Sequence, residues 1–221
     1  MKLVAISDLH GNLIDIPQAD LVVMTGDFSP LSIQCKYVDM IMWIDFQFLP
    51  WIKRLDCNKF GFIAGNHDFC CENPNFKQQF DKLVKSHQLD DKVIYLEQSE
   101  YEYNGLRIFG CPYSNISGWA FSTAQKPDAY RAIPHDVDIL LIHQAPEIGA
   151  VGHSYPGTPL EQVWGSKELT AEIDLKNPRY VFCGHIHTGE RHQKYQQTDI
   201  YNVSILDEDY KIAFEPLCIE I

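Results

Sequence analysis

Short runs of consecutive apolar residues recur along the chain, and a polar cluster follows each of them. Strands that are buried on both faces of a sheet read as continuous apolar runs, whereas half-exposed strands alternate. The pattern therefore predicts five buried strands at Lys2–Ser7, Leu21–Met24, Phe60–Ala64, Val137–Ile142 and Tyr180–Cys183.

Segments with helical spacing of apolar residues lie between these runs. Residues 38–55 are densely apolar and predict a buried helix that is kinked or broken at Pro50. Asn73 is a good N-cap for an amphipathic helix that reaches His87, and Ser166 is a good N-cap for another helix. Strands that alternate with helices in this way are typical of the α/β class.

The remaining segments predict edges and loops. Asn104-Gly105 lies between two short apolar runs, which is a strong signal for a β-hairpin. Residues 210–214 are expected to form a closing strand, and residues 149–165, rich in glycine and proline, a mobile loop. We find no linker, internal repeat or low-complexity tract, so residues 1–221 are predicted to form a single domain.

Composition narrows the class of protein. The chain has 221 residues, 45% of them apolar, and a formal net charge of -12, which disfavours a general nucleic-acid or membrane-surface binder. Its seven cysteines are scattered without CxxC spacing, which indicates reduced thiols in a cytoplasmic protein. No signal peptide is recognisable, and no segment approaches the ~20 apolar residues of a membrane span.

The polar clusters carry the candidate chemistry. Each lies at the end of a predicted strand, where α/β folds place their ligands. Two carboxylates, one amide and several imidazoles suit divalent manganese, iron, zinc or nickel better than calcium or magnesium, which prefer oxygen ligands. The clusters are Asp8-x-His10, Gly26-Asp27, Gly65-Asn66-His67-Asp68, His143 and Gly184-His185-x-His187.

The number of candidate ligands favours two metals. Seven are too many for one catalytic zinc, which uses three protein ligands, and they suit a pair of ions if one carboxylate bridges them. Each cluster alone has an ordinary explanation: Gly-Asp is a common turn, and a single histidine such as His143 can belong to the core. Five clusters in order, each after an apolar run, favour the metal site.

The ordered set of clusters resembles the signature of the calcineurin-like metallophosphoesterases. The likeness runs from Lys2 to about Ser204, and residues 106–121 with His185–Gly189 further resemble a small branch, the metallophosphoesterase-domain-containing proteins. The resemblance implies a four-layer α/β/β/α sandwich of two mixed sheets flanked by helices, with two metals at the strand ends.

The resemblance also implies roles for individual residues. One metal would be held by Asp8, His10 and His187, and the other by Asn66, His143 and His185, while Asp27 would bridge them and His67 would face the phosphate together with Asn66.

Some positions differ from better-known relatives. Phosphoprotein phosphatases have a second aspartate that orients the catalytic histidine, followed by an arginine, but here Gly26-Asp27 is followed by Phe28-Ser29-Pro30. Pro30 cannot orient His67, and the missing arginine disfavours a phosphoprotein substrate. The tyrosine that purple acid phosphatases have just after this aspartate is also missing.

These observations predict a metal-dependent hydrolase of small phosphate esters. A phosphodiesterase acting on substrates such as cyclic nucleotides is favoured, while a phosphomonoesterase and an inactive binding scaffold of the same fold remain alternatives. Nuclease activity on a polymer is disfavoured by the acidic balance. Loop 149–165 could close over the substrate, and Trp119 and Phe121 are expected to pack under their loop rather than to line a cleft. The sequence leaves the oligomeric state open.

Overall fold

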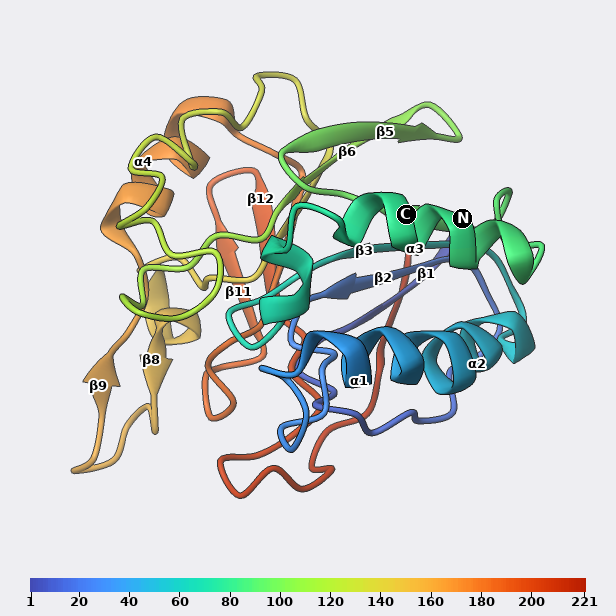
Figure 1. Cartoon of the computed structure of the whole chain (residues 1–221). Coiled ribbons are helices and arrows are strands. Elements are labelled where there is room, and N and C mark those ends of the chain that lie inside the picture. Colours follow the sequence, from blue (N-terminus) through green and yellow to red (C-terminus); the bar gives the residue numbers. More distant parts are fainter.

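The computed structural model describes residues 1–221 and contains two large β-sheets (Figure 1). The first sheet has the strand order β13-β1-β2-β3-β4, and the second the order β11-β12-β10-β7-β6-β5. The first comprises β1 (Lys2–Ile6), β2 (Ala19–Thr25), β3 (Cys57–Ile63), β4 (Val93–Tyr95) and β13 (Leu217–Glu220). The second comprises β5 (Ser99–Tyr103), β6 (Leu106–Cys111), β7 (Ile139–Ile142), β10 (Tyr180–Cys183), β11 (His192–Tyr195) and β12 (Thr198–Asn202).

Both sheets are mixed. Strands β1 to β4 run parallel and β13 pairs antiparallel with β1. In the second sheet β6, β7, β10 and β12 run parallel, and the edge strands β5 and β11 are antiparallel. The five buried strands predicted from the apolar runs are all present, as is the hairpin at Asn104-Gly105.

Alternate residues of the strands enter different cores, which produces four layers. Leu3 and Ala5 of β1 pack between the sheets with Leu141 and Phe182 of the second sheet. Val4 and the other outward residues of the first sheet pack under helices α1 (Tyr37–Trp43), α2 (Leu49–Arg54) and α3 (Phe76–Ser86). On the far side, the second sheet packs against α4 (Lys167–Lys176). The predicted α/β/β/α sandwich is confirmed.

The helix predicted around Pro50 is continuous but contains a π-helical segment. Residues Ile44–Phe48 form this segment between α1 and α2, just before Pro50. Proline has no N–H for an α-helical bond to the fourth residue before it, and a π-turn is a common way to accommodate such an interruption. The helix is not buried all round, because Met42 and Phe46 are 53% and 69% exposed.

Three other expectations are wrong in detail. Helix α3 begins at Phe76, since the Asn73 side chain accepts a hydrogen bond from the N–H of Asn75 and forms a turn before the helix. Residues 210–214 form no strand. The strand at this edge of the second sheet, next to β12, is β11. Residues 149–165 contain a 3₁₀ turn (Gly149–Gly152) and a small hairpin of β8 (His153–Ser154) and β9 (Gln162–Val163). The cap at Ser166 is confirmed, because its hydroxyl accepts from the N–H of Leu169 at 3.2 Å.

None of the helices combines the length and the apolar character that crossing a membrane would require. The polar residues that follow the strands of both sheets lie close together. Ser7, just after β1, pairs with Ser204, just after β12, so the carboxyl ends of the two sheets meet there.

Candidate metal centre

The polar residues that follow five strands converge where the two sheets meet. Asp8 and His10 follow β1, Asp27 follows β2, Asn66 and His67 follow β3, His143 follows β7, and His185 and His187 follow β10. All are buried except His67 and His185, which are half-buried.

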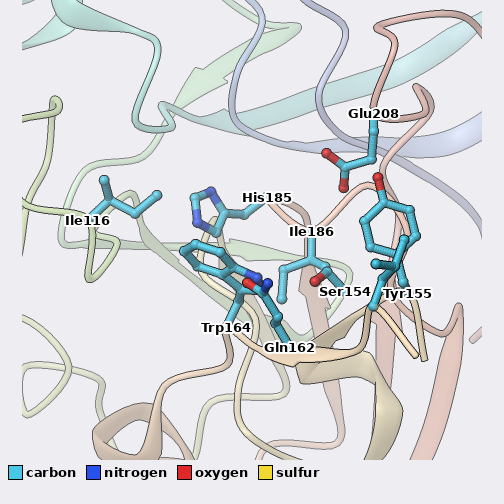
Figure 2. Close-up of a pocket in the computed structure, with 9 residues that line it drawn as sticks. Ile116, Ser154, Tyr155, Gln162, Trp164, His185, Ile186 and Glu208 are labelled. Carbon is cyan, nitrogen blue, oxygen red and sulfur yellow. The ribbon is translucent and has the colours of Figure 1, made fainter. Parts of the chain in front are cut away.

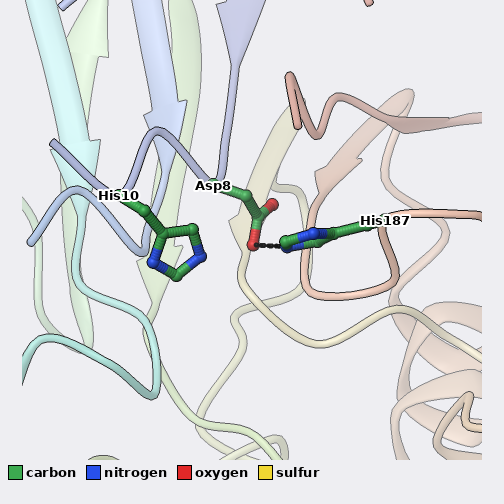
Figure 3. A group of neighbouring side chains, drawn as sticks. All are labelled: Asp8, His10 and His187. Atoms are coloured by element: carbon green, nitrogen blue, oxygen red, sulfur yellow. Dashed lines mark ion pairs between the residues drawn. The ribbon is translucent and has the colours of Figure 1, made fainter. Parts of the chain in front are cut away.

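Asp8, His10 and His187 form one tight group (Figure 3). Their potential ligand atoms lie within 4.8 Å of one another, and His187 Nε2 is 3.5 Å from Asp8 Oδ1. Burial alone would raise the pKa of Asp8, but the hydrogen bond and charge of His187 and the other imidazoles hold that pKa well below its usual range. Asp8 is therefore a carboxylate, as a metal ligand must be.

Asp27 lies at the centre of the cluster. Its Oδ2 is 3.3 Å from His143 Nε2, 3.7 Å from His10 Nε2 and 3.9 Å from His67 Nε2. The nearby imidazoles outweigh the effect of burial and lower the pKa of Asp27. It shares one group of potential ligands with Asp8 and His143, and another with His10 and His67. This central position is the one a bridging carboxylate would need.

Two imidazoles have their proton positions fixed by backbone carbonyls. Nδ1 of His143 donates to the carbonyl of Thr25 at 2.8 Å, and Nδ1 of His187 donates to the carbonyl of Asp207 at 2.8 Å. A histidine metal ligand is held in the same way, with one nitrogen bonded to an outer acceptor and the other free for the metal.

The other nitrogens face only acceptors. His143 Nε2 lies 2.8 Å from Asn66 Oδ1 and 3.3 Å from an Asp27 oxygen. Unless a positive charge lies between them, this arrangement is repulsive. Burial lowers the pKa of His143, but Asp27 outweighs it and raises the pKa to about 9; Asp8 likewise raises the pKa of His187 to about 9. Without a metal, Nε2 of His143 and Nε2 of His187 therefore carry protons, at positions that suit metal cations.

His10 and His185 show the complementary behaviour. Both ring nitrogens of His10 are buried and have no hydrogen-bond partner, which destabilises the fold unless a ligand binds them. Burial lowers the pKa of His10 to about 4 and that of His185 to about 3. Neutral imidazoles with an unpaired nitrogen are the form that binds a metal, so the donor set fits two divalent ions.

The local backbone is strained where the ligands lie. Asp8, His10, Asp27 and His185 have φ values of 55°, 43°, 53° and 71°, in the left-handed region that non-glycine residues rarely adopt. Such strain concentrates at functional sites, where the surrounding structure holds it in place. Gly184 permits the close approach, because a Cβ there would collide with the side chains of Ser7 and Asp8.

Two residues to which the sequence assigned no role support the ligands. The buried carboxylate of Asp68 accepts hydrogen bonds from the N–H groups of Asp27, Ser29 and Gly65 at 2.8, 3.0 and 2.7 Å, and so ties the end of β2 to the end of β3. Ser204 donates to Asp8 Oδ2 at 2.7 Å and orients that carboxylate. The position of Asp68 inside a motif was the sequence signal that could have indicated its supporting role. No sequence signal indicated the role of Ser204.

His67 is held by a glutamine. Its Nδ1 donates to Oε1 of Gln34 at 2.6 Å, which leaves Nε2 facing Asp27. Its ring also lies 4.4 Å from the Trp119 ring, centroid to centroid. Pro30 indeed makes no bond to His67, and Gln34, four residues later, fills the orienting role. Burial lowers the pKa of His67.

A cavity of about 170 Å³ opens onto the cluster. Besides the predicted residues, Trp119, Tyr210, Glu208 and Ile116 line it. The Tyr210 ring lies 4.9 Å from the His10 ring and 5.4 Å from the His187 ring. The expectation for Trp119 is therefore wrong, because it lines the cleft, while Phe121 is buried as expected.

All eight predicted site residues thus meet at one place, although not with equal closeness. His185 belongs to none of the groups whose ligand atoms lie within 4.8 Å, and its ring is 5.0 Å from the His143 ring. His67 belongs to such a group with His10 and Asp27, so its geometry allows a ligand role as well as a substrate role. The assignment of each residue to a metal or to the substrate stays a prediction.

Comparison with known proteins places this cluster in a family. The profile of the family described as calcineurin-like phosphoesterase matches residues 1–189. The chain belongs to this family. Members of this family usually hold two divalent metals, in agreement with the donor set described above, and membership suggests a hydrolase.

Two curated relatives cover nearly all of the chain. Human metallophosphoesterase domain-containing protein 1 is 26% identical over 242 residues, which span 100% of this chain and 71% of the human protein. UPF0046 protein K07C11.7 of Caenorhabditis elegans is 24% identical over 228 residues, 98% of this chain and 74% of that protein. The predicted likeness to this small branch is confirmed.

Solved structures agree on the fold. A protein from Thermus thermophilus aligns with a TM-score of 0.58 at 13% identity, covering 91% of this chain and 88% of that one. Phosphopantetheinyl hydrolase from Mycobacterium tuberculosis aligns with a TM-score of 0.54 at 16% identity, covering 95% and 90%. At these identities the likeness concerns the fold alone.

Proposed function

We propose that the chain is a two-metal phosphodiesterase that hydrolyses small phosphate esters such as cyclic nucleotides. The observation that carries this proposal is the pair of imidazoles, His143 and His187, whose Nδ1 atoms donate to backbone carbonyls while their Nε2 atoms face carboxylates. A structural histidine does not need this arrangement, whereas a metal ligand does.

The ligands divide into two sets around Asp27. Asp8, His10 and His187 would hold one metal, Asn66, His143 and His185 the other, and Asp27 both. The bound ions, manganese, iron, zinc or nickel, would supply Lewis acidity and activate a water molecule for attack on phosphorus.

The protein itself supplies positioning and a proton. The Asn66 amide, beside the cluster, would donate to a phosphate oxygen in addition to its ligand role. His67 Nε2 would protonate the leaving oxygen as the phosphorus–oxygen bond breaks. Oε1 of Gln34 accepts the Nδ1 proton of His67, so Nε2 carries the proton to be donated when the ring is the imidazolium, and Trp119 lies against that ring.

The rival functions are a phosphomonoesterase and an inactive scaffold. An inactive scaffold would need none of the strain at Asp8 and Asp27, and this disfavours it. Against a monoesterase, a second cavity next to the first, lined by Tyr155 and Trp164 among others, offers room for a group that stays on phosphorus.

A substrate panel tests the proposal. Metal-loaded protein should hydrolyse diesters and cyclic nucleotides faster than monoesters with the same leaving group, and a chelator should abolish the activity. A preference for monoesters would establish the monoesterase. Full metal binding with no turnover of any ester would establish the scaffold.

We also propose a single domain and a cytoplasmic location. The location is supported by seven cysteines that are all free. Recovery of the chain from a secreted or organelle fraction would contradict the location, and two separate unfolding transitions in calorimetry would contradict the single domain.

A further inference from the structure

A second, larger cavity continues from the first along the β8–β9 hairpin (Figure 2). It measures about 380 Å³, and the two cavities share the side chains of Ile116, His185 and Glu208. The rest of its wall comes from the β8–β9 segment and from one residue next to His185: Ser154, Tyr155, Leu160, Gln162, Trp164 and Ile186. A molecule bound at the metal centre can therefore extend directly into it.

The wall of this cavity is apolar and open to solvent. Leu160, Trp164 and Tyr155 are 67%, 48% and 38% exposed. Neighbouring apolar side chains left exposed around a cavity, next to a polar centre, are typical of a ligand site. The aromatic rings of Trp164 and Tyr155 suit a flat, aromatic partner.

The position of this wall is fixed by a buried amide next to a predicted metal ligand. Gln144 follows His143 and is fully buried. Its Nε2 donates to the carbonyl of Trp164 at 3.0 Å, and its Oε1 accepts from the N–H of Asn115 at 3.0 Å, the residue before Ile116. The Gln144 side chain thus fixes the positions of two walls of the cavity relative to the metal centre.

The charge of the cavity excludes a second phosphate. No lysine or arginine lines it, and Glu208 contributes a carboxylate at the junction of the two cavities. An anionic group would be repelled there. A neutral group with a hydrogen-bond donor would fit, with Glu208 and the Gln162 amide as its polar partners.

The two cavities differ in their relation to His67. His67 and Trp119 line only the first cavity, so a leaving group that takes its proton from His67 lies there. The oxygen of a water molecule bonds to phosphorus, and the bond to the leaving oxygen breaks. The leaving oxygen accepts the His67 proton, and the proton that the water loses passes to solvent, from which His67 is protonated again. A group in the second cavity therefore stays on phosphorus and departs with the monoester product.

On the basis of the function proposed above, we infer that the second cavity binds the non-leaving arm of a phosphodiester, and that this arm is a neutral aromatic group. A cavity of about 150 Å³ already accommodates benzene, so 380 Å³ is ample for one or two fused rings. Trp164 is the residue expected to recognise the arm.

Two synthetic diesters with the same leaving group test the inference. Phenyl p-nitrophenyl phosphate and methyl p-nitrophenyl phosphate both release p-nitrophenolate, and they differ only in the arm that stays. The quantity measured is the ratio of kcat/KM for the phenyl diester to that for the methyl diester, in manganese-loaded protein. Comparison of this ratio between variants cancels the intrinsic reactivity of the two compounds.

Trp164→Ala should lower this ratio about tenfold, which corresponds to about 1.4 kcal/mol. Val163→Ala is the matched control, because Val163, the residue before Trp164, is 55% exposed and does not line the cavity. Circular dichroism and metal content would confirm that both variants are folded and loaded.

The outcomes are distinct. An unchanged ratio in Trp164→Ala, or an equal fall in Val163→Ala, would overturn the subsite while leaving phosphodiester hydrolysis intact. If the wild-type protein hydrolysed neither diester, the proposed function would fail, and the subsite with it.

Discussion

Replacement of Gln34 by alanine removes the acceptor that holds the His67 ring. The bond joins His67 Nδ1 to Gln34 Oε1 at 2.6 Å, and His67 is only 12% exposed at its side chain. Without it the imidazolium, the form that carries a proton on Nε2 as well as on Nδ1, loses the acceptor that stabilises it, and the ring can rotate away from the leaving group.

The size of the effect follows from the bond that is lost. His67 gives up its proton as the imidazolium, and a hydrogen bond to a charged group contributes about 1.5–3 kcal/mol net, so Gln34→Ala should lower kcat/KM roughly 12- to 160-fold. His67→Ala removes the proton donor itself and should cost about 10²–10⁴-fold. Both variants should keep their metals, if His67 serves the substrate.

Gln34→Glu distinguishes positioning from general damage. It keeps the acceptor and adds a negative charge, which raises the pKa of His67, a pKa that burial has lowered. The rate should recover relative to Gln34→Ala, and the alkaline limb of the kcat/KM profile should move to higher pH. The measurement is that profile with a cyclic nucleotide, whose alkoxide leaving group needs the proton, whereas p-nitrophenolate can leave without one.

Two results would refute the reasoning about Gln34. One is an unchanged rate and pH profile in Gln34→Ala. The other is a loss of metal that parallels the loss of activity in His67→Ala, which would make His67 a ligand.

Three further predictions concern the metal cluster. Asp27→Asn should lower the occupancy of both metals and nearly abolish hydrolysis, whereas Asp8→Asn should leave one metal bound; calorimetric titration in which Asp27→Asn retains one site at wild-type affinity would make Asp27 a terminal ligand. Gly184→Ala should lower Tm and metal content because its Cβ would meet the Asp8 side chain, whereas Gly61→Ala, with no atom within 4 Å of the added carbon, should not. In metal-free protein, the two imidazoles with a pKa raised to about 9 stabilise the fold below the unfolded value of about 6.5. That contribution is lost as pH rises through 9, so Tm should fall over this range, and the fall should vanish after metal loading; a flat profile without metal would contradict the assigned proton positions.

The sequence predicted the buried strands and the turns at their ends well, because these features depend on local patterns. Continuous apolar runs marked the strands buried on both faces, and the glycines before Asp27 and Asn66 marked the turns at their ends. The hairpin at Asn104-Gly105 followed from residues that adopt positive φ, which here are 51° and 77°. Such signals reside in a few neighbouring residues and survive without knowledge of the tertiary structure.

The missed features depend on contacts between distant parts of the chain. Gln34 lies 33 residues from His67 in a turn with no distinctive pattern, and only the packing of the two sheets brings Tyr210 to His10. The left-handed backbone at Asp8 could not be foreseen either, since local preference opposes it and tertiary contacts impose it. The π-helical segment before Pro50 likewise reflects how the chain resolves a missing hydrogen bond.

The central claim is that this cluster holds two metal ions. Elemental analysis of the purified chain, stripped with a chelator, reloaded with manganese and desalted, tests it most directly, with the stripped protein as the control. We predict about two manganese ions per chain, divided between the two sets of ligands that share Asp27. One ion per chain, or none, would contradict the claim.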